Sequence, residues 1–120
     1  MSHWLFVYGT LKQGCCNHAQ LAGQKLIGDA KTPPGFQLYD LGGYPGIGPD
    51  PLDSEGVRGE VWEVSAEALA RLDAFEGVAE GLYERRPIPL LAPFHQTTVE
   101  AYFPVVSLAG RRALGTEWKE

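Results

Sequence analysis

Apolar positions along the chain follow strand-like patterns more often than helical ones. Residues 4–8, WLFVY, form a β-rich apolar run, which predicts a buried central strand. Residues 57–64 alternate between two sets of side chains, as the two faces of a strand do. Four further segments predict strands: residues 25–31, 36–41, 83–91 and 97–103.

The segments between these strands are rich in glycine and proline, so they predict loops and short helices. Residues 17–22 predict a short helix that Gly23 ends, and residues 92–96 predict a turn between two paired strands. Residues 42–51, with four glycines and three prolines, predict a long irregular loop, and the polar tail 109–120 has no clear pattern. Because strands come in runs and outnumber helices, the pattern predicts an α+β fold.

Length and charge narrow the class of protein. A chain of 120 residues is long enough for a core of its own, and we expect a single domain over residues 1–120. The net charge of −5 argues against a nucleic-acid partner, since phosphate binding needs clustered Lys and Arg. The longest apolar run is far shorter than the ~20 residues that span a bilayer, and no secretory signal is expected, so a membrane partner is not expected either.

The cysteines and histidines give no pattern of a metal site. Cys15 and Cys16 are adjacent, a spacing that rarely permits an unstrained disulfide, and this indicates free thiols in a reducing, cytoplasmic compartment. The three histidines have no ligand spacing with these cysteines, and Walker, dinucleotide-binding and serine-elbow motifs are absent from the sequence. We therefore expect neither a metal nor a cofactor.

One carboxylate interrupts the apolar stripe of the longest predicted helix. Ser65 is a suitable N-cap for a helix that runs to Glu76, and Gly77 is a typical residue after a helix end. At about 100° per residue, Glu76 falls between Leu69 and Leu72. Burial of an ionised carboxylate without a partner costs several kcal/mol and raises its pKa.

Two interpretations of Glu76 remain open on this pattern. At the helix end the side chain can turn to water or pair with Arg85 or Arg86, and periodicity alone favours this structural role. The other interpretation is a half-buried general base inside a cavity. Asp73 borders the same stripe, and we expect it to make a structural hydrogen bond to nearby backbone.

The residues that follow the first predicted strand are a second candidate site. Gly9 comes directly after that strand, and a glycine there lets backbone N–H groups turn toward a ligand. Successive N–H groups that point the same way form an anion-binding nest. On this pattern alone, a simple turn is the favoured interpretation.

Several short segments in a fixed order carry a more specific signal over nearly the whole chain. They are FVYGTLK at 6–12 with Gly14 and Asn17-His18, YPGI at 44–47, VRGEVWEV at 57–64, LDAFEG at 72–77, YERR at 83–86, and Gly115 and Trp118. Together they resemble the γ-glutamylcyclotransferase-like superfamily. Within it, the chain is most similar to the γ-glutamylamine cyclotransferases and their small bacterial relatives.

The resemblance implies a fold and a set of site residues. The fold is a small mixed β-barrel-like sheet flanked by short helices, with a cavity beside the first loop. The resemblance implies that Glu76 is the catalytic acid/base, and this favours the functional interpretation of that residue. The implied substrate-binding residues are Tyr8, Gly9, Thr10 and Leu11, whose backbone holds a carboxylate, and Tyr83 near the site.

The implied reaction needs no metal or cofactor. The α-amine of a γ-glutamyl amine or amide attacks its own γ-carbonyl, which gives 5-oxoproline and a free amine. The expected partner is a small γ-glutamyl molecule, and the resemblance does not name the amine that leaves. The alternative is a non-catalytic small-molecule binding protein of the same fold, in which the cavity is kept without turnover.

Overall fold

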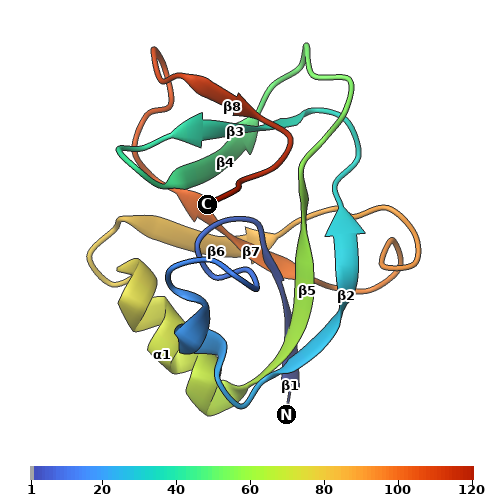
Figure 1. The fold of residues 1–120 in the computed structure, drawn as a ribbon, viewed down its shortest axis with the longest axis vertical. Helices are drawn as coiled ribbons and strands as arrows, with labels where there is room; N and C mark the ends of the chain where they lie inside the picture. Colours follow the sequence, from blue (N-terminus) through green and yellow to red (C-terminus); the bar gives the residue numbers. More distant parts are fainter. Residues whose placement is uncertain (1) are drawn as a thin grey trace.

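Two β-sheets and one α-helix make up most of the computed structural model, which describes residues 2–120 (Figure 1). The larger sheet contains, in spatial order, β2 (Lys25–Lys31), β5 (Arg58–Ser65), β1 (Ser2–Val7), β7 (Glu100–Pro104) and β6 (Tyr83–Pro87). The smaller sheet contains β4 (Pro45–Pro49), β3 (Phe36–Asp40) and β8 (Ala113–Gly115). The helices are α1 (Ala66–Glu76) and the short 3₁₀ helix His18–Leu21.

Strand β1 is the central strand of the larger sheet, as its apolar sequence predicts. It pairs with β5 in antiparallel fashion and with β7 in parallel, so the sheet is mixed. Its side chains alternate between two buried clusters, with Leu5 and Val7 in one and Phe6 in the other. Both faces of this strand are therefore covered, which explains why its sequence is apolar throughout.

The two clusters fill opposite faces of the larger sheet. On one face, Phe6 and Val61 pack with Leu38 and Ile47 of the smaller sheet. On the other face, Trp62 and the other residues of the second cluster pack with the helices, through Leu21, Ala68, Leu69 and Leu72. In Figure 1 the smaller sheet lies at the top and α1 at the lower left, with β6 and β7 between them. The arrangement confirms an α+β fold.

Both ends of α1 agree with the prediction from sequence. The Ser65 hydroxyl accepts a hydrogen bond from the Ala68 N–H at 3.1 Å, and so caps the first turn. Gly77 adopts a left-handed conformation with φ of 74°, which ends the helix directly after Glu76. No helix among residues 2–120 is both long enough and apolar enough to cross a membrane.

The prediction of an irregular loop over residues 42–51 is wrong, because β4 lies inside that segment. Its glycines serve close packing. A Cβ on Gly46 would lie 2.6 Å from Leu41 Cδ1, and one on Gly48 would lie 2.2 Å from Leu108 Cδ1. The glycines of this segment therefore indicate a strand whose neighbours approach too closely for a side chain, and not a loop.

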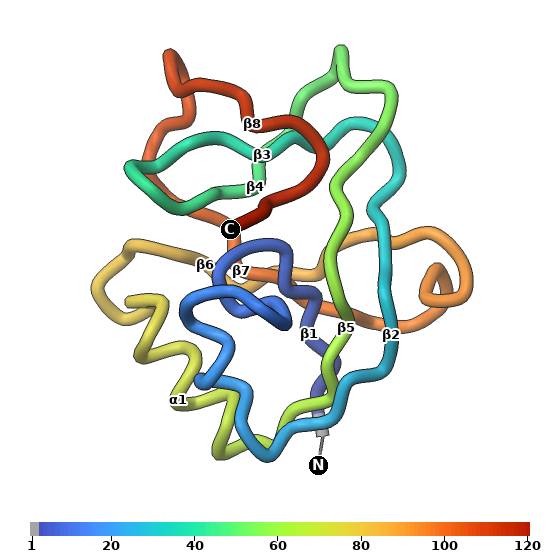
Figure 2. The backbone as a smooth tube through the Cα atoms, in the orientation of Figure 1, coloured from blue at the N-terminus to red at the C-terminus, as the bar shows by residue number. Residues whose placement is uncertain are grey.

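The C-terminal half differs from its prediction in two further places. The connection between β6 and β7 extends from residue 88 to residue 99, longer than the turn expected at 92–96. The tail forms β8 and then returns to the loop that follows β1, as Figure 2 shows. There Lys12 Nζ donates to the Trp118 carbonyl at 2.5 Å, and the Glu120 carboxylate accepts from the Cys16 N–H at 2.7 Å.

Candidate functional site

A cavity of about 420 Å³ opens between the loop after β1, the end of α1 and the turn between β3 and β4. Its walls combine apolar and aromatic side chains with few polar groups, a typical composition for a small-molecule site. The lining residues are Phe6, Val7, Tyr8, Gly9, Thr10, Leu11, Cys16, Asn17, Gly43, Tyr44, Pro45, Phe75, Glu76, Leu82, Tyr83 and Tyr102. Every site residue predicted from the sequence is among them.

The loop after β1 forms a tight turn whose central amides are unused. The Lys12 N–H donates to the Gly9 carbonyl at 3.1 Å. Within residues 2–120, none of the turn, loop or side-chain hydrogen bonds has the N–H of Gly9, Thr10 or Leu11 as its donor. Adjacent free amides in a turn can bind an anion such as a carboxylate.

Asn17 and His18, which follow later in the chain, hold this turn in place. The Asn17 side-chain amide donates to Thr10 Oγ1 at 3.0 Å, and the Asn17 N–H donates to the Thr10 carbonyl at 2.9 Å. His18 Nδ1 lies 2.9 Å from the Leu11 carbonyl oxygen, so His18 also fixes the loop. The amides of the turn are therefore fixed before any ligand binds.

Gly9 is constrained by its neighbour and not by its own backbone angles. Its φ is outside the left-handed region, but a Cβ at this position would lie 2.8 Å from Pro45 Cγ. The glycine thus allows the turn between β3 and β4 to close against the first loop. This contact brings Tyr44 and Pro45 into the cavity wall.

Glu76 reaches the cavity from the last turn of α1. It makes no hydrogen bond or ion pair with another described residue, and burial raises its pKa to about 7. The negative end of the helix dipole gives a carboxylate at this position no compensation. Arg85 and Arg86, the partners that a structural role would use, bind other groups. A general base that operates near neutral pH has these properties.

Two tyrosines near Glu76 stay protonated over the physiological range. Burial raises the pKa of Tyr8 well above its usual value, and the nearby Tyr83 and Glu76 add to the shift. Burial, followed by the charge of Glu76, likewise raises the pKa of Tyr83. The Tyr8 hydroxyl donates to the Tyr102 carbonyl at 2.6 Å, whereas the Tyr83 hydroxyl has no such partner within residues 2–120.

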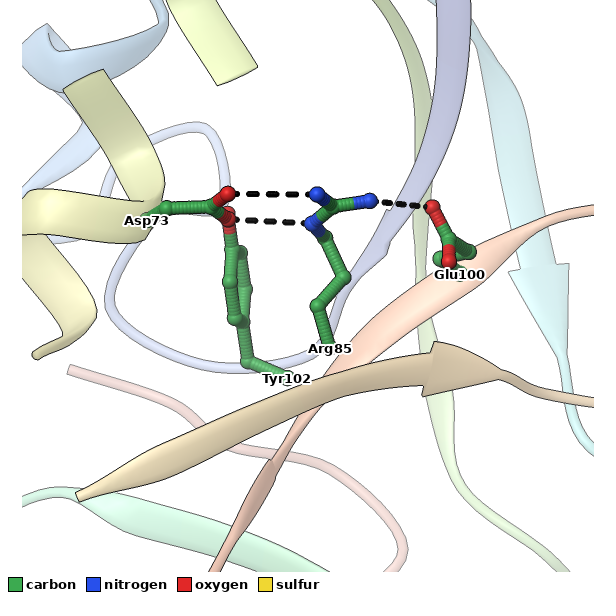
Figure 3. A network of polar contacts seen from close by, with 4 residues as sticks. All are labelled: Asp73, Arg85, Glu100 and Tyr102. Atoms are coloured by element: carbon green, nitrogen blue, oxygen red, sulfur yellow. Dashed lines mark hydrogen bonds and ion pairs between the residues drawn. The ribbon is translucent and has the colours of Figure 1, made fainter. Parts of the chain in front are cut away.

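Asp73, one turn before Glu76, belongs to a polar network beside the cavity (Figure 3). Arg85 donates to both of its carboxylate oxygens, at 3.0 and 3.1 Å, and the Tyr102 hydroxyl donates to one of them at 2.6 Å. Arg85 also donates to Glu100 at 2.5 Å. The prediction that Asp73 bonds nearby backbone is thus wrong, because its carboxylate accepts hydrogen bonds from the side chains of Arg85 in β6 and Tyr102 in β7.

Sequence reasoning missed part of the cavity wall. Cys16, Phe75 and Leu82 line it although no pattern marked them as site residues. The sequence signals nearby were two predicted site residues: Phe75 immediately precedes Glu76, and Leu82 immediately precedes Tyr83. Within residues 2–120, no group of three or more His, Cys, Asp or Glu side chains is arranged to hold a metal ion.

Comparison with known proteins identifies a family model and several relatives similar to this chain. The family model described as "Gamma-glutamyl cyclotransferase, AIG2-like" matches residues 5–120. A Vibrio cholerae protein provisionally named a gamma-glutamylcyclotransferase is 45% identical over 78 residues, 65% of each chain. A Niallia circulans protein named gamma-L-glutamyl-butirosin B gamma-glutamyl cyclotransferase is 39% identical over 87 residues, 68% of this chain and 53% of that protein. The chain thus spans less than two thirds of either relative.

A solved structure gives the same result for the fold. The crystal structure of an AIG2-like protein from Mus musculus superposes with a TM-score of 0.73 at 26% identity. The superposition covers 88% of this chain and 79% of the mouse protein. The expected γ-glutamylcyclotransferase-like fold is confirmed.

Proposed function

We propose, from the premise that this chain belongs to the AIG2-like gamma-glutamyl cyclotransferase family, that it converts a γ-glutamyl amine or amide to 5-oxoproline and a free amine. One observation carries the proposal: the partnerless Glu76 carboxylate lines the same cavity as the unused amides of Gly9, Thr10 and Leu11. The name of the Niallia circulans relative, which refers to a γ-glutamyl substrate, supports it further.

The first step is binding and proton removal. The amides of the first loop hold the α-carboxylate of the γ-glutamyl group, which orients the adjacent α-ammonium toward Glu76. Glu76 takes a proton from this ammonium, because its pKa of about 7 leaves part of it ionised at neutral pH. The freed amine is then a nucleophile within the same molecule as its target.

Ring closure and departure of the amine complete the reaction. The α-nitrogen forms a bond to the γ-carbonyl carbon, and the excess proton on this nitrogen passes to the leaving nitrogen as the tetrahedral intermediate collapses, so the amine departs as its ammonium. The bond from that carbon to the leaving nitrogen breaks, and Glu76 returns its proton to this nitrogen. Fixing both ends of the γ-glutamyl chain favours ring closure by proximity.

Tyr83 is the side chain best placed to stabilise the oxyanion. It lines the cavity close enough to Glu76 for the carboxylate charge to raise its pKa, so it remains a neutral hydroxyl donor. A donor aimed at developing negative charge is among the stronger contributions to catalysis. Of the predicted site residues, Tyr83 therefore takes this role in the proposal, beside the loop amides.

The charge of the cavity favours a leaving group without a carboxylate. None of its lining residues is Lys or Arg, and Glu76 is the one carboxylate among them. A leaving group that is itself an amino acid would bring a second carboxylate into the site without a cation to receive it, which is costly. An amine leaving group avoids this cost.

The proposal is tested by incubation with γ-glutamylethylamide and γ-glutamylalanine, with 5-oxoproline measured by mass spectrometry. The two compounds differ by the single carboxylate on the leaving group. We expect 5-oxoproline from the ethylamide at a kcat/KM about 10-fold or more above that of the alanine compound, and unchanged rates in EDTA. Loss of activity in EDTA would contradict the metal-independent mechanism.

The alternative, a non-catalytic binding protein, gives a different result. Calorimetry would then detect binding of γ-glutamylethylamide, while no 5-oxoproline would form over prolonged incubation. If every γ-glutamyl amide tested is bound and none is converted, the non-catalytic binding protein becomes the favoured hypothesis.

A further inference from the structure

Three large apolar side chains are exposed although they line the cavity. They are Tyr44, Phe75 and Leu82, with exposed fractions of 44%, 42% and 54%. They come from three separate parts of the chain: the turn between β3 and β4, the last turn of α1, and the residue before β6. Exposed apolar groups that meet at one concave site are a mark of ligand binding.

Leu82 is held beside Glu76 by the backbone. Its N–H donates to the Gly77 carbonyl at 3.0 Å, and its carbonyl accepts from the Val105 N–H at 3.0 Å. The side chain packs over Gly77, where a Cβ would lie 2.7 Å from Leu82 Cδ1. Phe75 precedes Glu76 in the helix, so apolar groups lie next to the carboxylate along the chain and across the Gly77 turn.

The proposed reaction assigns this region to the leaving group. The α-carboxylate of the substrate occupies the first loop, and Glu76 must reach both the α-nitrogen and the leaving nitrogen. The part of the substrate beyond the leaving nitrogen then extends past Glu76, away from the first loop. The exposed apolar side chains that line the cavity next to Glu76, in sequence or across the Gly77 turn, are Phe75 and Leu82.

We propose that Phe75 and Leu82, with Tyr44, form a subsite for the hydrocarbon part of the leaving amine, and that the preferred substrates are γ-glutamyl amides of alkyl or arylalkyl amines. This inference rests on the proposed function. A hydrocarbon group bound here removes the half-exposed side chains from water, which is favourable in proportion to the area buried. The subsite also lacks a cation, so it offers nothing to a charged acid.

The test compares γ-glutamylmethylamide with γ-glutamyl-(2-phenylethyl)amide, which share the reacting atoms and differ in hydrocarbon. We expect kcat/KM for 5-oxoproline formation to be about 10-fold or more higher for the phenylethyl compound. In Phe75→Gln and Leu82→Gln, the ratio between the two compounds falls toward one. Leu52→Gln is the matched control, because Leu52 is 92% exposed and lies outside the cavity, and we expect it to keep the wild-type ratio.

The outcomes separate this inference from the proposed function. Equal kcat/KM values in the wild type, or a ratio unchanged in both Gln variants, would overturn the subsite while leaving the reaction in place. If one variant does not fold, as judged by circular dichroism, the other decides. If neither amide gives 5-oxoproline, the proposed function fails. Calorimetry of the phenylethyl compound with wild type and Leu82→Gln then decides the subsite alone: weaker binding by the variant supports it, and equal binding rejects it.

Discussion

Asp73 and Glu76 lie one turn apart on the same helix and have opposite surroundings. Asp73 accepts hydrogen bonds from Arg85 and Tyr102, whereas Glu76 has no partner among the described residues. Burial acts against ionisation of both carboxylates. At Asp73 the hydrogen bonds outweigh burial and lower the pKa, while at Glu76 burial acts alone and raises the pKa to about 7.

The difference teaches that helical position alone does not decide the role of a carboxylate. The surroundings of each carboxylate are set by other parts of the chain. Arg85 of β6 and Tyr102 of β7 donate hydrogen bonds to Asp73, whereas Glu76 lines the cavity. One carboxylate thus stabilises the wall of the site and the other is available for chemistry.

The largest effect is expected from Glu76→Gln. The variant keeps the shape of the side chain but removes the basic oxygen, so we expect turnover to fall by about 100-fold or more. Stability at neutral pH stays equal or rises, because an unpaired, mostly buried charge becomes a neutral amide. The measurements are 5-oxoproline formation and urea unfolding.

If the Glu76→Gln variant kept wild-type activity, Glu76 would not be the general base. A Glu76→Gln chain that fails to fold would make its carboxylate structural and would erase the contrast with Asp73. Binding of γ-glutamylethylamide by calorimetry serves as the control, since the first loop is intact in this variant.

The second prediction concerns pH. For Glu76 the folded-state pKa of about 7 exceeds the ordinary value of 4.5, so the folded state binds its proton more tightly. The stabilisation is therefore complete below the ordinary pKa and is lost as the pH rises through about 7. We expect the free energy of unfolding of wild type, relative to Glu76→Gln, to fall by on the order of 2–3 kcal/mol between about pH 4 and about pH 8.

Turnover follows the same ionisation in the opposite sense. Because the ionised form is the base, kcat/KM of the wild type falls on acidification, with an apparent pKa of about 7. Urea unfolding at several pH values and a pH–rate profile provide the two measurements. A stability difference that does not change with pH would show that the folded environment leaves the pKa of Glu76 unshifted.

The sequence indicated the unusual position of Glu76 but not the hydrogen-bond partners of Asp73. Periodicity placed Glu76 between Leu69 and Leu72, where a charge in an apolar stripe is a local inconsistency. That pattern alone favoured a structural role, and the family resemblance then favoured a functional one. The cap at Ser65 and the end at Gly77 follow from local chemistry and were predicted correctly. Local signals of this kind need no knowledge of distant partners.

What the sequence could not provide depends on contacts between distant segments. Asp73 and Arg85 are 12 positions apart and meet only after β6 folds back past the helix, so the pairing has no periodic signature. The strand β4 was concealed by Gly46 and Gly48, which are required by Leu41 and Leu108 from outside the segment. The same holds for Phe75, which lines the cavity together with residues from the first loop and from the turn between β3 and β4.

The third prediction concerns Asp73→Asn. The amide keeps one acceptor oxygen but cannot receive both Arg85 hydrogen bonds, so a largely buried guanidinium loses the charge of one of its two carboxylate partners and keeps only that of Glu100. We expect a loss of about 1–3 kcal/mol in the free energy of unfolding at neutral pH. For turnover we expect a decrease smaller than that of Glu76→Gln, because the hydroxyl of Tyr102 in the cavity wall then bonds a neutral amide oxygen in place of a carboxylate, while the base remains.

The pH dependence distinguishes Asp73 from Glu76. Because the folded-state pKa of Asp73 is lowered, its stabilisation is present above the ordinary value and is lost as the pH falls through the folded pKa. The gap between wild type and Asp73→Asn therefore narrows on acidification, opposite in sign to the trend for Glu76→Gln. Tyr102→Phe is the control that removes one hydrogen bond and leaves the Asp73–Arg85 pair in place.

The smallest effect is expected from Glu100→Gln, at the outer end of the same network. Glu100 receives a hydrogen bond from Arg85 but lies outside the 420 Å³ cavity, and its side chain is 27% exposed. Partly exposed ion pairs contribute up to about 1 kcal/mol, so we expect a loss within that range in urea unfolding and no change in 5-oxoproline formation. If Glu100→Gln instead lowered stability and turnover as much as Asp73→Asn, the two carboxylates would act on Arg85 as one unit. The relevant comparison would then be between Glu76 and the whole network, because the order of Arg85 would depend on both of its partners.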